Sequence, residues 1–168
     1  MVWVYFDASA LVKRYSPEDG TDLVNELFHQ LPVEQVTCAM IGLLEIISVL
    51  VRKRNDDRLS QKLFAQAMIE LNQEIIEDEA FSIASVDDEL ILSALDLIAQ
   101  HNINATDAII LRSCLNLQQV LQEQGHRLVL WSCDKRLLRA AQNEGVDVFD
   151  PEVETKAQLQ TLLSSSSI

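Results

Sequence analysis

Short runs of apolar residues alternate along the chain with longer segments in which apolar residues recur every three or four positions. The short runs are rich in β-branched and aromatic side chains and have no polar face, which is typical of strands buried on both sides. Strands are expected at residues 3–6, 33–38, 81–86, 126–131 and 146–149. Helices are expected at residues 10–15, 40–54, 59–76, 87–100, 104–123 and 134–144, with another around Leu23 and Leu27. The alternation predicts an α/β fold with a parallel sheet between layers of helices, without fixing the order of the strands.

A single domain is expected from the length of 168 residues, and the 48% share of hydrophobic residues is that of a folded protein. We place the domain at residues 1–150 and a serine-rich C-terminal tail, in which partial disorder is expected, at residues 151–168. The longest nearly apolar run, residues 38–51, contains Glu45 and is too short to cross a membrane. Because no signal peptide is visible at the N-terminus, we expect a cytoplasmic protein with no membrane partner.

The three cysteines and three histidines do not form a metal-binding pattern. No pair of cysteines has the C-x-x-C spacing, and their odd number fits a reducing compartment better than a disulfide framework. Any metal chemistry must therefore use oxygen ligands.

Four acidic residues stand at positions that call for an explanation. Asp7 follows the first expected strand, and Asp134 lies just beyond the fourth. In an open α/β sheet, ligands bind in the crevice outside the carboxyl ends of the strands, so both acids belong to that edge. Glu45 lies inside the apolar stretch IGLLEIISVL, and Asp107 lies at the start of the helical stretch NATDAIILRS.

Three of these acids also have a purely structural explanation. Asp107 can be the third residue of a helix-capping box, Asp134 a first-turn acid favoured by the helix dipole, and Asp7 an Asx-turn residue. Glu45 has no such role, because a buried carboxylate is costly unless it is paired or binds a metal, and no Lys or Arg lies within one turn of it. As a set, the four carboxylates indicate a site for a hard cation such as Mg²⁺ or Mn²⁺, which can activate water to hydrolyse a phosphodiester.

These residues occur in segments that resemble the PIN-domain nucleases, and most closely the VapC-type ribonuclease toxins of prokaryotic toxin–antitoxin pairs. The shared features are a strand followed by D-x-S-A-L-V-K-x-Y, the turn P-E-D-G-T, a glutamate inside an apolar helix, A-T-D-A-I-I-L and S-C-D-K-R-L-L-R-A-A. They occur in the family's order between residue 2 and about residue 150. The resemblance implies a three-layer α/β/α sandwich around a mostly parallel sheet of about five strands.

The resemblance also implies a function. It assigns as catalytic, metal-binding acids Asp7, Glu45, Asp107 and Asp134, and as supporting hydroxyl residues Ser9, Thr106 and Ser132. The implied protein is a Mg²⁺- or Mn²⁺-dependent endoribonuclease, the toxin of a toxin–antitoxin pair, with an RNA substrate, a small antitoxin partner and a homodimeric state. Two features depart from the compact toxins: the longer stretch between Asp107 and Asp134, and the Ser-Cys that precedes Asp134.

The net charge of −13 argues against a general polyanion binder. However, ten of the 13 basic residues lie within 13 positions after one of the four acids, and no basic residue lies between Lys62 and Arg112. We therefore expect a basic rim that guides RNA phosphates to the acids. The candidate members of this rim are Lys13, Arg14, Arg52, Arg54, Arg112, Lys135 and Arg136. Helix ends also collect Lys and Arg to suit the helix dipole, which would give the same pattern without RNA.

The main alternative is a non-catalytic PIN-like module that binds RNA or protein without cutting it. Metal-stimulated cleavage that a chelator abolishes would separate the two. A phosphate-handling α/β domain fits less well, because haloacid-dehalogenase phosphatases need D-x-D after the first strand and the third position here is Ser9. Receiver domains need an acidic pair after that strand and a lysine after the last one, and neither is a good match.

Overall fold

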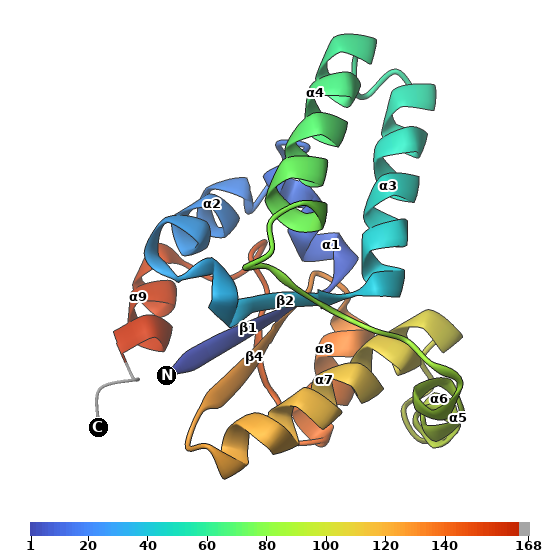
Figure 1. The fold of residues 1–168 in the computed structure, drawn as a ribbon, viewed down its shortest axis with the longest axis vertical. Helices are drawn as coiled ribbons and strands as arrows, with labels where there is room; N and C mark the ends of the chain where they lie inside the picture. Colours follow the sequence, from blue (N-terminus) through green and yellow to red (C-terminus); the bar gives the residue numbers. More distant parts are fainter. Residues whose placement is uncertain (165–168) are drawn as a thin grey trace.

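The computed structural model describes residues 1–164 and contains a five-stranded, all-parallel sheet (Figure 1). The strands are β1 (Val2–Phe6), β2 (Val36–Ala39), β3 (Ser82–Ala84), β4 (Arg127–Trp131) and β5 (Asp147–Phe149). Their order across the sheet is β3-β2-β1-β4-β5, so the first strand is central. β1 pairs with β4 from Val2 opposite Arg127 to Phe6 opposite Trp131, so the carboxyl ends of these strands meet at one edge.

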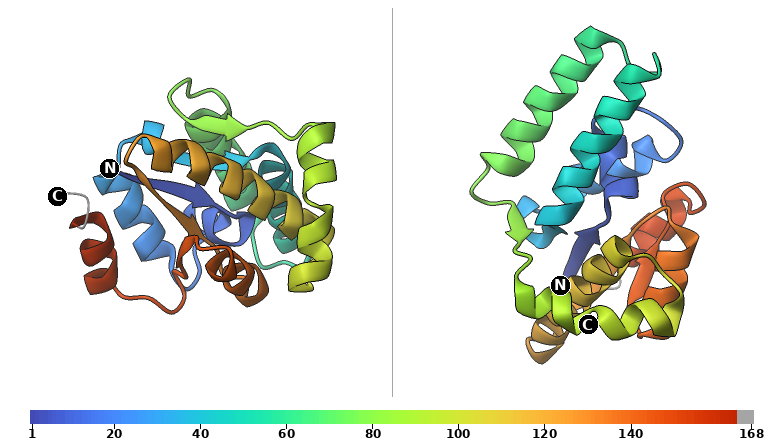
Figure 2. Two further views of the ribbon diagram at one scale, coloured as in Figure 1. Left: turned by 90° about the horizontal axis from the view of Figure 1, so that it is seen from below. Right: turned by 90° about the vertical axis from the view of Figure 1, so that its right-hand side faces the viewer.

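Helices cover both faces of the sheet (Figures 1 and 2). One face carries α1 (Ala8–Leu11), α2 (Thr21–Gln30), α3 (Met40–Asn55), α4 (Gln61–Leu71) and α9 (Lys156–Ser164). The other carries α6 (Leu95–His101), α7 (Ala105–Glu123) and α8 (Lys135–Asn143), with α5 (Asp88–Ser93) against α7. Val4 and Phe6 of β1 belong to the first core and Tyr5 to the second, which confirms the predicted α/β/α sandwich. None of the described helices is long and apolar enough to cross a membrane.

Four expected elements differ in detail from those observed. The helix expected at residues 10–15 is α1 followed by a 3₁₀ turn at Val12–Arg14. The second strand begins only at Val36, because a 3₁₀ turn precedes it. The helix expected at 59–76 becomes α4 followed by a π-helical turn at Asn72–Ile76. The helix expected at 87–100 is divided into α5 and α6 at Ala94, which is buried in the core. Hydrophobic periodicity does not distinguish these irregular turns from continuous helix or strand.

The segment after β5 packs against the rest of the chain. Leu159 and Leu162 of α9 are buried in the same core cluster as residues of α2. Gly20 has a φ of +87°, and a β-carbon built there would lie 2.6 Å from the carbonyl oxygen of Pro151. The expected tail therefore includes a packed helix that ends at Ser164, and the rest of that expectation, residues 165–168, lies outside the described residues.

An ion network joins the turn after α1 to α3 and to the segment after β5. Lys13, whose side chain is 1% exposed, bonds to Glu18 at 3.1 Å and to Glu152 at 2.6 Å. Lys53 of α3 contacts the other oxygen of Glu18 at 2.5 Å and the Ser16 hydroxyl at 3.1 Å. Burial disfavours the Glu18 carboxylate, but the hydrogen bonds from Lys53 and Lys13 outweigh this effect and lower its pKa.

Candidate functional site

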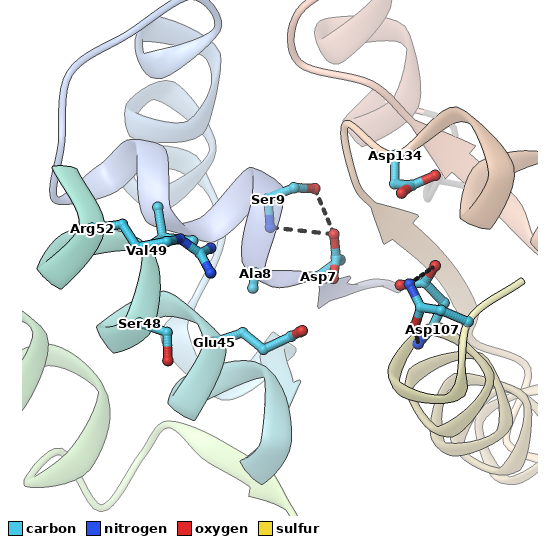
Figure 3. Close-up of a pocket in the computed structure, with 10 residues that line it drawn as sticks. Asp7, Ala8, Ser9, Glu45, Ser48, Val49, Arg52, Asp107 and Asp134 are labelled. Atoms are coloured by element: carbon cyan, nitrogen blue, oxygen red, sulfur yellow. Dashed lines mark hydrogen bonds between the residues drawn. The ribbon is translucent and has the colours of Figure 1, made fainter. Parts of the chain in front are cut away.

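The four predicted acids come together at the carboxyl edge of the sheet, where they line one cavity of about 370 Å³, called here the acid cavity (Figure 3). Each is positioned by a different element: Asp7 directly follows β1, Glu45 lies on the second turn of α3, Asp107 lies on the first turn of α7, and Asp134 caps α8. Two of them were expected at this edge because they follow strands. The fold adds the other two from helices that begin at the same edge.

Asp7 is 5% exposed, and its carboxylate makes all of its hydrogen bonds through one oxygen. Oδ2 accepts from the Ser9 amide at 3.2 Å, the Ser9 hydroxyl at 2.5 Å and the Ser132 hydroxyl at 2.9 Å. Among the described residues, Oδ1 has no donor. The Asp7 amide donates to the Trp131 carbonyl at 2.9 Å, which extends the β1–β4 pairing to this residue. The carboxylate is thus fixed at Oδ2 and free at Oδ1.

Ser9 and Ser132 connect Asp7 to the loop that carries Asp134. The Ser9 hydroxyl accepts from the Cys133 amide at 2.8 Å, and the Ser132 hydroxyl accepts from the Asp134 amide at 3.0 Å. Each serine therefore donates to Asp7 and accepts from the β4–α8 loop, so the two acids are held by a continuous chain of hydrogen bonds. Thr106, predicted with these serines, does not line the acid cavity, and its side chain makes no hydrogen bond among the described residues.

Asp107 and Asp134 each use one carboxylate oxygen for the start of a helix. The Asn104 side chain accepts from the Asp107 amide at 2.8 Å, and its Nδ2 donates to Oδ2 of Asp107 at 2.8 Å. Oδ1 of Asp134 accepts from the amides of Arg136 and Leu137, at 2.7 and 3.2 Å. The second oxygen of each carboxylate has no donor among the described residues. A capping role and a ligand role are therefore compatible, because they use different oxygens.

The carboxylate of Glu45 has no hydrogen-bond partner among the described residues. Burial and the charges of Asp7 and Asp107 raise its pKa to about 7, against a smaller opposing effect of Arg52. Burial, with the charges of Asp134 and Asp7, likewise raises the pKa of Asp107 to about 6. Negative charges thus crowd together in a partly buried place, which is the arrangement that a bound cation relieves.

The four carboxylates surround the acid cavity without converging on one point. Among the described residues, the ligand atoms that all lie within 4.8 Å of one another belong to Cys133, Asp150 and Glu152 instead. That group is a poor metal site, because Glu152 is paired with Lys13 at 2.6 Å and burial raises the pKa of the Cys133 thiol to about 12. A thiol must lose its proton to bind a metal.

Three of the predicted basic residues lie at or near the acid cavity. Arg52 lines it, seven residues after Glu45 on the same face of α3. Arg136 is close enough to Asp107 to oppose the rise of its pKa. Lys135 and Arg136 are exposed in the first turn of α8, next to Asp134.

Lys13 and Arg14 are engaged elsewhere. Lys13 is buried between Glu18 and Glu152, so the prediction that it contacts RNA is wrong. The sequence near Lys13 contains only one of the two partners, Glu18, because Glu152 is 139 positions away. Arg14 forms a two-bond ion pair with Glu74, with distances of 3.1 and 2.8 Å, which ties the 3₁₀ turn after α1 to the π-helical turn.

Arg54 and Arg112 lie outside the acid cavity. The Arg54 guanidinium lies over the ring of Phe64, 4.6 Å from its centroid. Arg112 donates through Nε to the Ser93 carbonyl at 2.9 Å and lines a second cavity.

Asn104, Ser48 and Val49 also line the acid cavity and were not predicted as site residues. Ser48 and Val49 lie three and four positions after Glu45, so helical spacing from that acid would have found them. The capping pattern at Asn104 is visible in the sequence. The hydrogen bond from the Asn104 side-chain amide to the Asp107 carboxylate is not.

The raised pKa of Glu45 predicts how the stability of the metal-free protein depends on pH. The ordinary pKa is 4.5 and the folded-state pKa is about 7, so between these values the folded state binds more protons than the unfolded state. The contribution of Glu45 to stability is therefore fully present below about pH 4.5 and is lost as the pH rises through about 7. Urea unfolding in the presence of chelator at about pH 5 and about pH 8 measures this change in stability. We expect Glu45→Gln to be more stable relative to the parent protein at the higher pH than at the lower. If the difference in free energy of unfolding between the two proteins is the same at both pH values, the prediction is contradicted.

The chain matches a family model described as PIN domain over residues 4–143. No curated protein matches the sequence significantly. Several solved structures share its fold. PAE2754 from Pyrobaculum aerophilum has a TM-score of 0.59 and 19% sequence identity, with 97% of this chain and 96% of that chain covered.

Two further structures agree. FitAcB from Neisseria gonorrhoeae has a TM-score of 0.60 and 19% identity over 90% of this chain and 99% of that chain. A toxin–antitoxin complex from Klebsiella pneumoniae has a TM-score of 0.51 and 16% identity over 88% of this chain and 97% of that chain. At these identities, the comparison establishes a common fold.

Proposed function

This chain belongs to the PIN-domain family, and we propose that it is a divalent-metal-dependent endoribonuclease that hydrolyses phosphodiester bonds of RNA. Members of the family are generally nucleases. The observation that carries the proposal is the acid cavity, where four carboxylates each keep at least one oxygen without a hydrogen-bond donor among the described residues. An all-oxygen set of this kind suits Mg²⁺ or Mn²⁺.

In this proposal Asp7, Glu45 and Asp107 hold the principal ion and Asp134 completes the site. The ion, when bound, supplies Lewis-acid polarisation of the phosphodiester and activation of water. Ser9 and Ser132 support this arrangement, because they hold Asp7 by Oδ2 and leave Oδ1 available. Glu45 and Asp107 must be ionised to bind the cation, so protons compete with it below their raised pKa values.

The experiment that tests the function is RNA cleavage with and without free metal ion. We expect cleavage in Mg²⁺ or Mn²⁺, none in excess chelator, and recovery when the ion is restored. Cleavage that continues at the same rate in chelator would overturn the proposed mechanism. RNA binding without cleavage under every metal condition would identify the chain as a non-catalytic module.

We propose that Arg52, Lys135 and Arg136 guide RNA phosphates into the acid cavity. Arg52 lines the cavity beside Glu45, and the other two residues are exposed at the start of α8 beside Asp134. Positive charge at the mouth of the cavity offsets the repulsion between its acids and a phosphate chain. This local arrangement supports binding of RNA despite the negative net charge.

Neutralising Arg52 is expected to weaken the response of RNA cleavage to salt. Arg52→Gln should lower kcat/KM at low salt by roughly tenfold and reduce the slope of its logarithm against log salt by about 0.7, the value for one phosphate contact to a single strand. The matched control is Arg54→Gln, because Arg54 lies against Phe64 outside the cavity. If the two variants behave alike, the effect comes from net charge and Arg52 is not a specific contact.

The proposed biological role is that of the toxin in a toxin–antitoxin pair, acting in the cytoplasm as a homodimer. One similar structure is a toxin–antitoxin complex, which supports a small antitoxin as the partner. A short neighbouring reading frame whose product binds this chain and blocks cleavage would support the role. Cleavage unaffected by any such product would favour a housekeeping nuclease.

A further inference from the structure

A second cavity, of about 410 Å³, lies between α5 and the middle of α7. Ser85 lines it and directly follows β3, so the cavity opens at the same carboxyl edge of the sheet as the acid cavity. Arg112 in its wall is five residues after Asp107 on α7, a rise of about 7.5 Å along the helix. Five residues also turn by about 140° around the helix, so α7 lines the two cavities with different faces. We call the second one the Arg112 cavity.

The fold uses only part of the Arg112 side chain. Nε donates to the Ser93 carbonyl at 2.9 Å, which holds the guanidinium against the end of α5. The two Nη groups make no hydrogen bond and no ion pair with any described residue. Asp87 and Glu89 line the same cavity, yet neither forms an ion pair with the guanidinium. The arginine therefore keeps a free pair of donors beside two carboxylates.

The charges of the Arg112 cavity favour a neutral ligand over a phosphate. One guanidinium shares the cavity with two carboxylates, so an anion would meet more like charge than opposite charge. One carboxylate oxygen of Asp87 accepts a hydrogen bond from the Leu90 amide at 2.8 Å, and the other has no donor among the described residues. The side chains of Glu89 and Asn116 have no hydrogen-bond partner among the described residues. A fitting ligand would offer acceptors to the arginine and donors to the carboxylates.

We propose that the Arg112 cavity binds a guanine base of the RNA, an inference that rests on the ribonuclease function proposed for the acid cavity. Guanine presents O6 and N7 as a pair of acceptors, and their bidentate contact with arginine is the commonest specific contact to a base. Its N1–H and 2-amino groups are donors that suit Asp87 or Glu89. Leu90 supplies an apolar wall for the face of the ring. Adenine places an amino donor beside N7, where the guanidinium offers no acceptor.

Single-stranded RNA can reach such a cavity, because its unstacked bases turn outward and expose their hydrogen-bonding edges. Both cavities open at the carboxyl edge of the sheet and are lined by α7, so one strand that passes around this helix can engage both. The Arg112 cavity would then select where the chain is cut, and the acid cavity would cut it.

The test measures binding in chelator, so that no strand is cut. Fluorescence anisotropy is followed with labelled single-stranded RNAs that differ at one position, which carries guanine, adenine, cytosine or uracil. The guanine strand should bind about five- to 150-fold more tightly than the adenine strand, the range for one bidentate base contact. Replacing guanine by 7-deazaguanine, which lacks N7, or by hypoxanthine, which lacks the 2-amino group, should each remove part of this preference.

Arg112→Lys keeps the positive charge and loses the paired donors. It should abolish the preference for guanine while leaving the affinity for the adenine strand unchanged. The control is Arg127→Lys, at the amino end of β4 on the opposite edge of the sheet, which should keep the preference. Thermal unfolding is measured alongside, and if Arg112→Lys is unfolded, Glu89→Gln and Asp87→Asn together should still remove the difference between guanine and hypoxanthine.

Equal binding of the four bases, a preference for another base, or a guanine preference that survives Arg112→Lys would overturn the proposal. These outcomes are independent of catalysis, because the metal is absent throughout. A chain that prefers guanine but shows no metal-dependent cleavage would support guanine binding in the Arg112 cavity and contradict the ribonuclease function. A chain that cleaves RNA without any base preference would support the ribonuclease function and contradict the base-binding role of the Arg112 cavity.

Discussion

Asp7→Asn is expected to lower metal-dependent RNA cleavage by more than about a hundredfold while the protein stays folded, since loss of groups that merely support metal ligands already costs 10–100-fold. Asparagine is nearly isosteric, and its single carbonyl oxygen can replace Oδ2 as the acceptor from Ser9 and Ser132. What is lost is the negative charge that Oδ1 would offer to a cation. Removing one of four crowded carboxylates also relieves repulsion. Initial cleavage rates and thermal unfolding with and without Mn²⁺ measure both effects, and Mn²⁺ should stabilise only the parent.

The matched control for this change is Asp147→Asn. Asp147 opens β5 at the other edge of the sheet and forms an exposed pair with Arg127, so its loss should change stability by at most about 1 kcal/mol and leave cleavage intact. An Asp7→Asn protein that cleaves RNA at the parental rate would exclude Asp7 as a metal ligand. An unfolded Asp7→Asn protein would instead show that the carboxylate serves the fold.

Gly20→Ala is expected to destabilise the protein by about 2–4 kcal/mol, in which the left-handed backbone alone contributes about 1–2 kcal/mol. The φ of +87° already disfavours a side chain, and the added β-carbon would lie 2.6 Å from the Pro151 oxygen. Because that atom belongs to the backbone, the segment after β5 must shift to make room. The shift would also disturb the bond between Lys13 and Glu152. Urea unfolding should show the loss directly.

Gly125→Ala separates the two causes of this loss. Gly125 has a similar φ of +72°, but a β-carbon there would meet no atom within 4 Å. The variant should therefore lose only the backbone part, about 1–2 kcal/mol. Equal losses at both glycines would show that the contact with Pro151 adds nothing, and the packing of the segment after β5 would then not depend on it.

Much of the architecture could be predicted because it depends on local patterns. The apolar run before Asp7 marks a buried strand, and the alternation with helices leads to a parallel sheet. Once the sheet is parallel, Asp7 and Asp134 share an edge because both follow strands. Glu45 was identified because no local role explains a carboxylate inside an apolar helix. The structure confirms the sheet and brings the four acids to one cavity, while their roles as ligands stay predictions.

What could not be predicted depends on contacts between distant residues. Lys13 follows Asp7 closely and reads as part of a basic rim, but Glu18 and Glu152 draw it into the interior. The Arg112 cavity was hidden for the same reason, because Arg112 is 19 positions away from the residue that holds it, Ser93. Sequence spacing shows which residues share a helix face, but not which face will meet a partner from another element.

The assembly of the acid cavity from four separate elements has a consequence for how the protein is made. β4 lies between β1 and β5, so the central strand lacks one of its neighbours until the ribosome has translated residues 127–131. Asp134 is translated later still. The hydrogen bonds by which the two serines hold Asp7 in place also depend on the loop that precedes Asp134. A nascent chain stalled before this point carries three of the acids but no cavity to hold them. If the chain is a ribonuclease, the transcript from which it is translated and the translating ribosome are therefore not exposed to its activity until residues 127–134 have been made.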